Sequence, residues 1–397
     1  MPGLLSIEEA LRRVLARARP LEAEEVPVAD AAGRFLAEDA TARIDLPPFA
    51  SSAMDGYALR AADTPGPLPV VFRIAAGAPA ERPLAAGEAM AISTGGAVPE
   101  GADAVVPIEL VVELANALDV PAPVERGANV RSIGGDIRAG AVVLTTGTRI
   151  GAAQVGALAA AGVAKVSVAR RPRVVVLSTG TELRGPGEPL AAGQIYESNG
   201  PMLAAAFEAA GAEVERIGPV ADDESEHRRA LERGLASDVL VSSGGVSVGP
   251  HDLVRRILAE LGVEEDFWGV AVRPGKPLAF GVRGATLVFG LPGNPVSSLV
   301  AVELFVRPAL LALQGATDPG PSYELARLAS PLRRSPARDE LARARTTRDG
   351  DGTLLEPLTG QESHMIARAA GADALVLVPA GAGEIAAGES ARYLRLL

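Results

Sequence analysis

The chain contains no cysteine, which excludes disulfide bonds, thiolate metal ligands and a cysteine nucleophile. Aromatic residues make up 3% of its 397 residues, so the cores must be built from alanine, valine, leucine and isoleucine. No run of about 18 uninterrupted apolar residues occurs, and no membrane span is expected. The N-terminal segment lacks the basic and apolar stretches of a signal peptide. These absences predict a cytoplasmic protein.

Lysine is also scarce, and the 49 acidic residues outnumber the 38 lysines and arginines. The net charge is -11, which disfavours a nucleic-acid-binding protein because such proteins need a basic surface. Lys165 and Lys276 are the two lysines, and every other basic residue in the Lys/Arg count is arginine. This bias indicates that arginine replaces lysine wherever either serves. Lys276 is therefore expected at a position where arginine does not serve, since the two side chains differ in shape and hydration.

The alternation of turns and helical periods predicts four domains. Residues 6–18 read as an amphipathic helix with a capping box, Ser6 and Glu9. This helix belongs to an N-terminal helical and linker domain, 1–45 plus 146–172, which includes an alanine-rich helix at 151–162. Residues 46–145 alternate short apolar runs with glycine and proline turns, which predicts a small inserted β domain.

The second half of the chain is predicted to form an α/β domain, 173–318, and a C-terminal β barrel, 319–397. Alternation of strands and helices in the α/β domain indicates a doubly wound sheet with helices on both faces. Its strands are expected at 174–177, 213–217, 239–241, 278–280 and 286–289, and its helices at 201–210, 225–235, 253–261 and 296–313. The barrel strands are expected at 323–328, 341–346, 353–357, 374–378 and 391–396.

The stretch 242–252, SSGGVSVGPHD, stands between an apolar strand and a helix. A strand, a glycine-rich turn and a helix together are typical of phosphate-binding sites, because glycines allow close approach and the helix N-terminus presents free N–H groups. Ser242, Ser243 and Ser247 add hydroxyl donors, and Asp252 adds a carboxylate. The alternative is a plain glycine turn with Asp252 as a helix N-cap.

Four further loops adjoin predicted strands. Residues 178–183, STGTEL, offer a second anion cradle with Glu182 as a carboxylate, or else a capped turn. Asp222 and Asp223 either bind a ligand or cap the next helix. The loops 273–277, RPGKP, and 291–297, LPGNPVS, either contact a ligand or are plain turns.

The acidic and basic sets suggest Mg²⁺ together with phosphate, because hard cations take oxygen ligands and partner with phosphates. The carboxylates are Glu182, Asp222, Asp223 and Asp252, beside the basic pair Arg273 and Lys276. Three histidines and no cysteine disfavour a zinc site. No nucleophile-elbow pattern is present.

Taken in order, these motifs resemble the molybdopterin molybdenumtransferases, the family of MoeA and of the E domain of gephyrin. The resemblance covers nearly the whole chain. The motifs that carry it are 48–58, 93–95 (STG), 129–131 (NVR) with 135–136 (GD), 178–183, 242–249, 273–277 and 291–295.

The resemblance implies a homodimer of four-part chains that takes adenylated molybdopterin and molybdate with Mg²⁺, inserts molybdenum at the dithiolene and releases AMP. The site is expected between the α/β domain of one protomer and the small β domain of the other. The implied catalytic residues are Asp55, Thr94, Glu182, Asp252, Arg273 and Lys276. The implied substrate-binding residues are Arg131, Ser178, Thr179, Gly180, Ser242, Gly244, Gly245, Ser247, Pro292, Gly293, Asn294, Pro295 and Ser363. The implied metal ligands are Glu182, Asp222, Asp223 and Asp252.

The chain departs from the family pattern at two places. Residues 132–134, SIG, follow Arg131 where the family often has basic residues, and Gly269 stands at a family lysine position. Both lower the positive charge around molybdate. The implied partners are molybdopterin adenylyltransferase and Mo-enzyme maturation proteins, in transient contact, with no nucleic acid and no membrane. The alternatives are an adenylyltransferase that makes the adenylated pterin and a non-catalytic scaffold like gephyrin.

Overall fold

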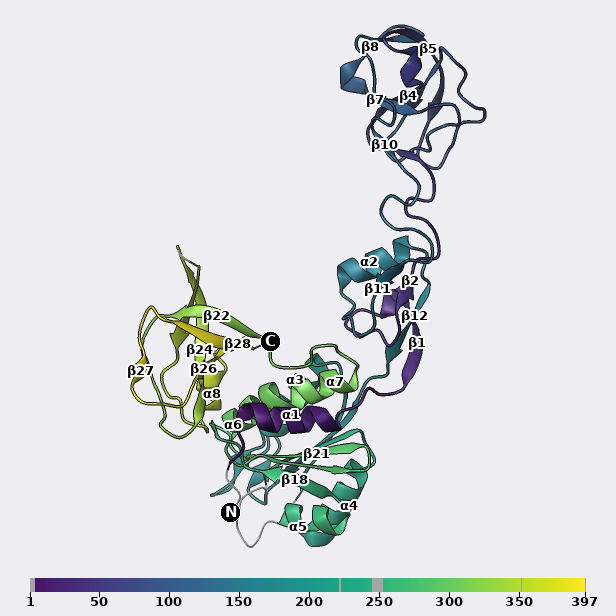
Figure 1. Cartoon of the computed structure of the whole chain (residues 1–397). Helices are drawn as coiled ribbons and strands as arrows, with labels where there is room; N and C mark the ends of the chain where they lie inside the picture. Colours follow the sequence, from purple (N-terminus) through teal and green to yellow (C-terminus); the bar gives the residue numbers. More distant parts are fainter. Residues whose placement is uncertain (1–3, 221–222, 245–252, 351, 397) are drawn as a thin grey trace. The chain divides into compact units, whose positions relative to one another are not determined.

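The computed structural model describes residues 4–220, 223–244, 253–350 and 352–396 (Figure 1). The chain forms two compact units. The first holds the residues up to Glu24, Gly33–Ala37 and those from Val168 onward; the second holds Glu25–Ala32 and Glu38–Ser167. The predicted N-terminal domain, 1–45 plus 146–172, takes residues from both units, and the four-domain division stays a prediction.

The first unit is built on a six-stranded mixed sheet. Its strands are β13 (Arg173–Thr179), β16 (Glu213–Val220), β17 (Val239–Ser243), β18 (Glu264–Trp268), β20 (Ala279–Arg283) and β21 (Thr286–Leu291). The strand order is β16-β13-β17-β21-β20-β18. The first four run parallel, and β20 is antiparallel to both β21 and β18. A two-stranded ribbon, β14 (Leu183–Arg184) with β15 (Ile195–Tyr196), follows β13.

Helices cover both faces of this sheet, which confirms the doubly wound fold. They are α1 (Ile7–Arg17), α3 (Asn199–Ala209), α4 (Glu224–Gly234), α5 (Leu253–Glu260), α6 (Pro295–Ala301), the π-helical η4 (Val302–Val306) and α7 (Arg307–Leu313). Successive residues of β13 point into opposite cores. Val176 packs with Phe207 of α3, whereas Leu177 packs with Leu231 of α4. This near-continuous apolar pattern is typical of strands buried on both faces.

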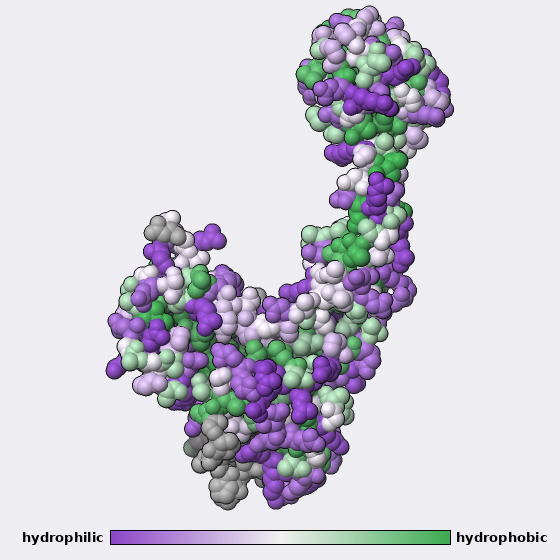
Figure 2. Space-filling model, viewed as in Figure 1, coloured by the Kyte–Doolittle hydropathy of each residue, from purple (hydrophilic) through white to green (hydrophobic). Residues whose placement is uncertain are grey.

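The segments α6, η4 and α7 form one helical run, Pro295–Leu313, that is long and apolar enough to cross a membrane. Of its most apolar window, 72% is buried inside the protein. Val300, Phe305 and Leu310 lie in the core beside the sheet. Figure 2 shows hydrophilic and hydrophobic residues interspersed on the visible surface. The run is therefore a core helix.

The C-terminal region forms the predicted barrel. Its elements are β22 (Tyr323–Leu328), β23 (Leu332–Arg333), β24 (Asp339–Asp349), β25 (Gly352–Pro357), α8 (Ile366–Ala369), β26 (Ala374–Val378), β27 (Glu384–Ile385) and β28 (Ser390–Arg395). The order β24-β25-β22-β28-β26 closes because β26 also pairs with β24. The short strand β19 (Val272–Arg273), from the loop after β18, pairs with the start of β24.

The second unit is mostly β structure, as predicted. Its main sheet has the order β7-β4-β6-β5-β9-β8. The elements are η1 (Val28–Asp30), β2 (Ala40–Thr41), β3 (Ser51–Ser52), β4 (Gly56–Leu59), η2 (Ala61–Asp63), β5 (Gly66–Ile74), β6 (Ala89–Ile92), β7 (Ala104–Pro107), η3 (Ile108–Leu110), β8 (Val112–Glu113), β9 (Ala117–Val120), β10 (Val130–Arg131), β11 (Val142–Leu144) and α2 (Ala152–Ala160). Two strands at the unit boundary, β1 (Ala23–Pro27) and β12 (Lys165–Ala169), pair with each other.

The structure differs from the sequence prediction at one sheet edge. Strand β18 was not predicted, because Glu264, Glu265 and Asp266 hide its apolar alternation. Phe267 at its far end is buried in the core. An edge strand tolerates such charge, since one side of its backbone is unpaired and one face is solvated. The sheet therefore gains a sixth strand at this edge, and it is mixed because β20 runs antiparallel to both of its neighbours, β21 and β18.

At the N-terminal edge of the sheet, Asp238 joins three chain segments. Its carboxylate accepts two hydrogen bonds from the Arg170 guanidinium, at 2.6 and 2.8 Å, and one from the Arg173 amide at 2.8 Å. Burial acts to raise the pKa of Asp238, but these hydrogen bonds outweigh it and the pKa lies below its usual value. The carboxylate is therefore ionised in the folded state at neutral pH.

We expect Asp238→Asn to lower the free energy of unfolding at neutral pH by about 1–3 kcal/mol, the usual cost of losing hydrogen bonds to a buried charge. Because folding lowers the pKa of Asp238, this contribution is fully present above the unfolded pKa of about 3.9. It is lost as the pH falls through the folded pKa. Urea unfolding at several pH values measures it. The exposed control Glu232→Gln should change the free energy of unfolding by less than about 0.5 kcal/mol. If the two variants are equally stable, the Asp238 carboxylate does not stabilise the fold.

Candidate functional site

Three turns lie side by side at the C-terminal edge of the sheet. The predicted residues on them are Ser178, Thr179, Gly180, Ser242, Gly244, Pro292, Gly293, Asn294 and Pro295. The register pairs Ser178 with Ser243, and Ser243 with Leu291. Strand β13 comes first in sequence, and β16 and β17 flank it. The order of the strands reverses there, and at such a switch point open α/β sheets form their ligand crevice.

Asn199, the first residue of α3, ties two of these turns together. Its Nδ2 donates to Ser243 Oγ and to the Gly293 carbonyl, both at 2.8 Å. The side chain is buried, and its Oδ1 has no hydrogen-bond partner within the described residues. A buried amide oxygen of this kind is costly unless a ligand or water donates to it. Asn199 is thus a strong candidate for ligand contact.

Glu197 stands beside Asn199 and is also buried. Its Oε1 accepts from the Gly200 amide at 2.7 Å. A Cβ on Gly200 would lie 2.6 Å from Glu197 Oε2 and 3.0 Å from Ser178 Oγ, so a larger residue there would displace the Glu197 carboxylate. Neither Glu197 nor Asn199 was predicted from the sequence, which placed the helix start at residue 201. The signal that could have found them is the polar run ESNG before the helix.

The turns after β13 and β17 each contain a glycine that other atoms approach closely. Gly180 has a φ of 153°, and a Cβ there would lie 2.6 Å from Glu182 Oε2. Gly244 has a φ of 92°, and its Cβ would lie 3.0 Å from the Thr179 carbonyl. Both conformations favour glycine. The turn after β13 therefore holds the exposed carboxylate of Glu182 against its own backbone, at the edge of the crevice.

The two serines that end β17 face opposite ways. Ser243 Oγ meets Asn199 on the α3 face, as described above. Successive side chains of a strand point to opposite faces of a sheet, so the Ser242 side chain is on the face covered by α4 and α5. Ser242 is therefore not brought together with the hydroxyl of Ser243, although the sequence grouped them.

The predicted metal ligands are described only in part. Asp223 caps α4: its Oδ1 accepts from Ser225 Oγ at 2.7 Å and from the Glu226 amide at 2.9 Å, and these bonds lower the pKa of Asp223. This is the capping alternative considered from the sequence. The predicted residues Asp222, Gly245, Ser247 and Asp252 lie outside the described residues. Within the described ranges no three acidic or histidine side chains cluster as metal ligands.

The predicted basic loop is held by the barrel. Arg273 pairs with Glu340 in the β19–β24 ladder, and its Nη1 lies 3.6 Å from Glu340 Oε2. Gly275, with a φ of 116°, approaches α6: a Cβ on it would lie 3.5 Å from the Ser297 carbonyl. The side chains of Arg273 and Lys276 are exposed. The loop therefore presents two cations near the N-terminal part of α6.

Ser363 reaches the same helix end from the barrel. Its carbonyl accepts from the Val296 amide at 3.1 Å. The loop that carries Ser363 is held by Arg343, a fully buried arginine that was not predicted. Arg343 donates to the carbonyls of Gly360, Glu362 and Met365. Barrel and sheet thus meet at the turn formed by residues 292–295.

In the second unit, three further motifs come together. The Asp55 carboxylate accepts from the Thr94 amide at 2.8 Å, and the Gly95 amide donates to the Ser52 carbonyl. Arg131 pairs with the adjoining residue, Ser51, in the β3–β10 ladder. Asp55, Thr94 and Arg131 are all exposed. These predicted residues, far apart in sequence, form one polar surface of this unit, which we name the Asp55 surface.

Comparisons with known proteins bear on every part of this fold. Residues 5–162 match the model of the MoeA N-terminal region (domain I and II), residues 175–312 that of a probable molybdopterin binding domain, and residues 325–396 that of the MoeA C-terminal region (domain IV). The α/β sheet and its crevice thus fall in the match to the molybdopterin-binding model. Fold and site define a multidomain protein of the molybdopterin-binding class.

Full-length relatives narrow that class. The molybdopterin molybdenumtransferase 2 of Mycobacterium tuberculosis is 37% identical, over 96% of this chain and 97% of its own. The molybdopterin molybdenumtransferase of Haemophilus influenzae is 33% identical, over 98% of this chain and 97% of its own. The crystal structure of the molybdopterin biosynthesis MoeA protein from Pyrococcus horikosii superposes with a TM-score of 0.82 at 34% identity, over 99% of each chain. The chain belongs to the MoeA family, the molybdopterin molybdenumtransferases of molybdenum cofactor biosynthesis.

We expect Asn199→Ala to lower the free energy of unfolding by about 1–3 kcal/mol, because two buried hydrogen bonds are lost and the Gly293 carbonyl loses its donor. The matched control is Ser198→Ala, since Ser198 is exposed and its side chain makes no capping hydrogen bond. Denaturant unfolding of the two variants measures the difference. If Asn199→Ala is as stable as Ser198→Ala, Asn199 does not hold the turns together.

Proposed function

We propose that this chain inserts molybdate into adenylated molybdopterin with Mg²⁺, forming the molybdenum cofactor and releasing AMP. The observation that carries the proposal is the meeting of three turns, the barrel loop of Ser363 and the basic loop at one edge of the sheet. The reaction joins a molybdate dianion to a substrate that already carries a pyrophosphate. Their mutual repulsion must be offset by fixed positive charge, which acts most strongly where water is excluded.

Two sources of positive potential converge at this edge. Arg273 and Lys276 are one, and the N-terminus of the long helical run Pro295–Leu313 is the other, since a helix N-terminus carries a partial positive charge. We assign molybdate to the space they share. A compact ammonium group suits a small tetrahedral oxyanion, which is consistent with Lys276 being one of two lysines in a chain whose other basic side chains in the Lys/Arg count are arginines.

Mg²⁺ fits the chemistry of the same edge. The available donors are oxygens, the carboxylate of Glu182 and the amide of Asn199 among them, and hard cations take oxygen ligands. We assign the ion to Glu182 with Asp222 and Asp252, because Asp223 already accepts two hydrogen bonds as a helix cap. Bound there, Mg²⁺ would stabilise charge on the phosphate that leaves in AMP.

The Asp55 surface completes the site in this proposal, as part of a homodimer in which each site takes the α/β domain of one protomer and the small β domain of the other. Asp55, Thr94 and Arg131 are exposed and belong to a different compact unit from the crevice. We place the enzyme in the cytoplasm, in transient contact with the adenylyltransferase that makes its substrate and the maturation proteins that take its product.

We expect Lys276→Arg to lower the molybdate-dependent rate of AMP release by roughly tenfold to a hundredfold. The larger planar group misplaces the oxyanion, and one charge-assisted hydrogen bond is worth about 1.5–3 kcal/mol. Lys276→Ala should be worse, with partial rescue at high molybdate. The matched control is Lys165→Arg, at an exposed lysine 3.7 Å from Glu25, which should leave the rate unchanged. An unaltered molybdate curve for Lys276→Arg would remove Lys276 from the site.

A site shared between protomers predicts complementation. Asp55→Ala and Glu182→Ala chains are each expected to be inactive. In a random mixture half the dimers are mixed, and each mixed dimer holds one intact site, so about a quarter of the wild-type activity should return under two-fold symmetry. AMP release after co-refolding measures it. Mixtures as inactive as the single variants would contradict the shared site.

A further inference from the structure

The face of the sheet beneath α5 has a recess, and the register of the strands explains it. Ser242 of β17 pairs with Gly290 of β21, and Gly290 pairs with Ala279 of β20. These three residues form one row across the sheet, and a row shares one face. All three are small, so the row leaves a gap under the helix.

The recess is closed on its other sides by apolar groups. The next row of the sheet contributes Val288 and Gly281, and α5 contributes Val254, Leu258 and Ala259. Gly281 cannot be larger, because a Cβ there would lie 2.7 Å from the Glu264 carbonyl. The space has a volume of about 270 Å³. Apolar cavities of about 150 Å³ already bind benzene, so this one has room for a two-ring molecule.

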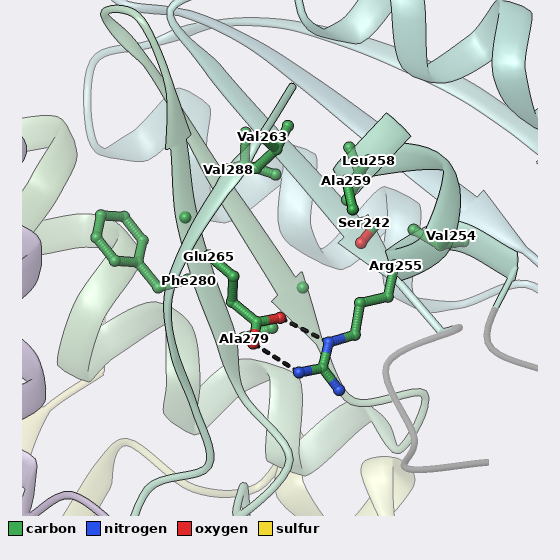
Figure 3. A pocket seen from close by; sticks show the side chains of 12 residues that line it. Ser242, Val254, Arg255, Leu258, Ala259, Val263, Glu265, Ala279, Phe280 and Val288 are labelled. Carbon is green, nitrogen blue, oxygen red and sulfur yellow. Dashed lines mark hydrogen bonds and ion pairs between the residues drawn. The ribbon is translucent and has the colours of Figure 1, made fainter. Parts of the chain in front are cut away.

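One polar atom faces this space without a partner. Ser242 is 1% exposed, lines the recess, and its Oγ has no hydrogen bond within the described residues. Figure 3 shows the hydroxyl among the apolar side chains of α5 and the sheet. A buried hydroxyl that finds no partner costs free energy, and such groups in native proteins are rare. The arrangement calls for a ligand atom that bonds to Ser242.

An ion pair borders the recess. Arg255 of α5 donates from Nε and Nη2 to the two carboxylate oxygens of Glu265 on β18, each at 2.6 Å (Figure 3). The opposite charges offset each other, so the rim favours neither an anion nor a cation. An uncharged ligand is therefore favoured over a phosphate or a carboxylate.

We propose that this recess is a second binding site, distinct from the crevice, for a flat uncharged ring of one or two cycles with one polar atom directed at Ser242. The crevice residues Asn199 and Ser243 lie on the opposite face of the same strand ends. A ligand in the recess would contact Ser242 of β17. This residue is next to Ser243, which accepts a hydrogen bond from Asn199. Binding there is independent of the proposed molybdenum chemistry.

The test uses two rings of the same shape, indole with an N–H donor and indene without one, in ligand-observed NMR titrations of the full chain. Indole should bind with a dissociation constant on the order of 1 mM, typical of so small a ligand. Ser242→Ala should weaken indole about two- to tenfold, the worth of one hydrogen bond, and leave indene unchanged. Failure of indole to bind, or equal affinity for Ser242→Ala, would overturn the proposal.

A second variant blocks the recess from outside. Ala259 is an exposed helix position, so Ala259→Phe should fold and remove binding of both rings. The matched control, Ala153→Phe, is an exposed position of α2 and should bind both rings normally. Addition of AMP separates the two sites: unchanged indole binding supports a separate recess, whereas displacement by AMP would make it part of the nucleotide site and overturn the proposal.

Discussion

The carboxamide of Asn199 fixes the distance between the strand ends on which the site depends. Its two hydrogen bonds join the start of α3 to Ser243 after β17 and to Gly293 after β21. Gly244 allows the backbone after β17 to approach the Thr179 carbonyl, and Gly180 and Gly200 leave room for the carboxylates of Glu182 and Glu197. The barrel is attached to the same edge through the hydrogen bond between Ser363 and Val296, and the basic loop is attached to the barrel through the pairing of β19 with β24.

Much of this arrangement follows from local sequence. The doubly wound sheet, the barrel and the three turns were predicted because buried strands leave apolar runs and tight turns need glycine. The family resemblance grouped Asp55 with Thr94, and the structure joins them by a hydrogen bond. The Asp223 cap was one of the two alternatives considered, and only the fold shows which hydrogen bonds the carboxylate accepts.

Other features could not be read from the chain. Strand β18 is hidden by its acidic residues. Arg343 looks like any surface arginine until three backbone carbonyls and the Gln361 side-chain amide accept hydrogen bonds from it. Asn199 is the first residue of a helix whose start was predicted two residues late, and Glu197 lies two residues before it. The opposite directions of Ser242 and Ser243 depend on where β17 ends, because a one-residue change in register exchanges the two faces. These are consequences of tertiary packing, which local patterns do not encode.

The central claim is that this edge of the sheet unites molybdate with adenylated molybdopterin. The most direct test follows AMP release and molybdenum incorporation together, with purified chain, adenylated molybdopterin and Mg²⁺, with and without molybdate. The account predicts that AMP appears only when molybdate is present and in step with incorporated molybdenum. AMP release at the same rate without molybdate, or incorporation without AMP release, would contradict it.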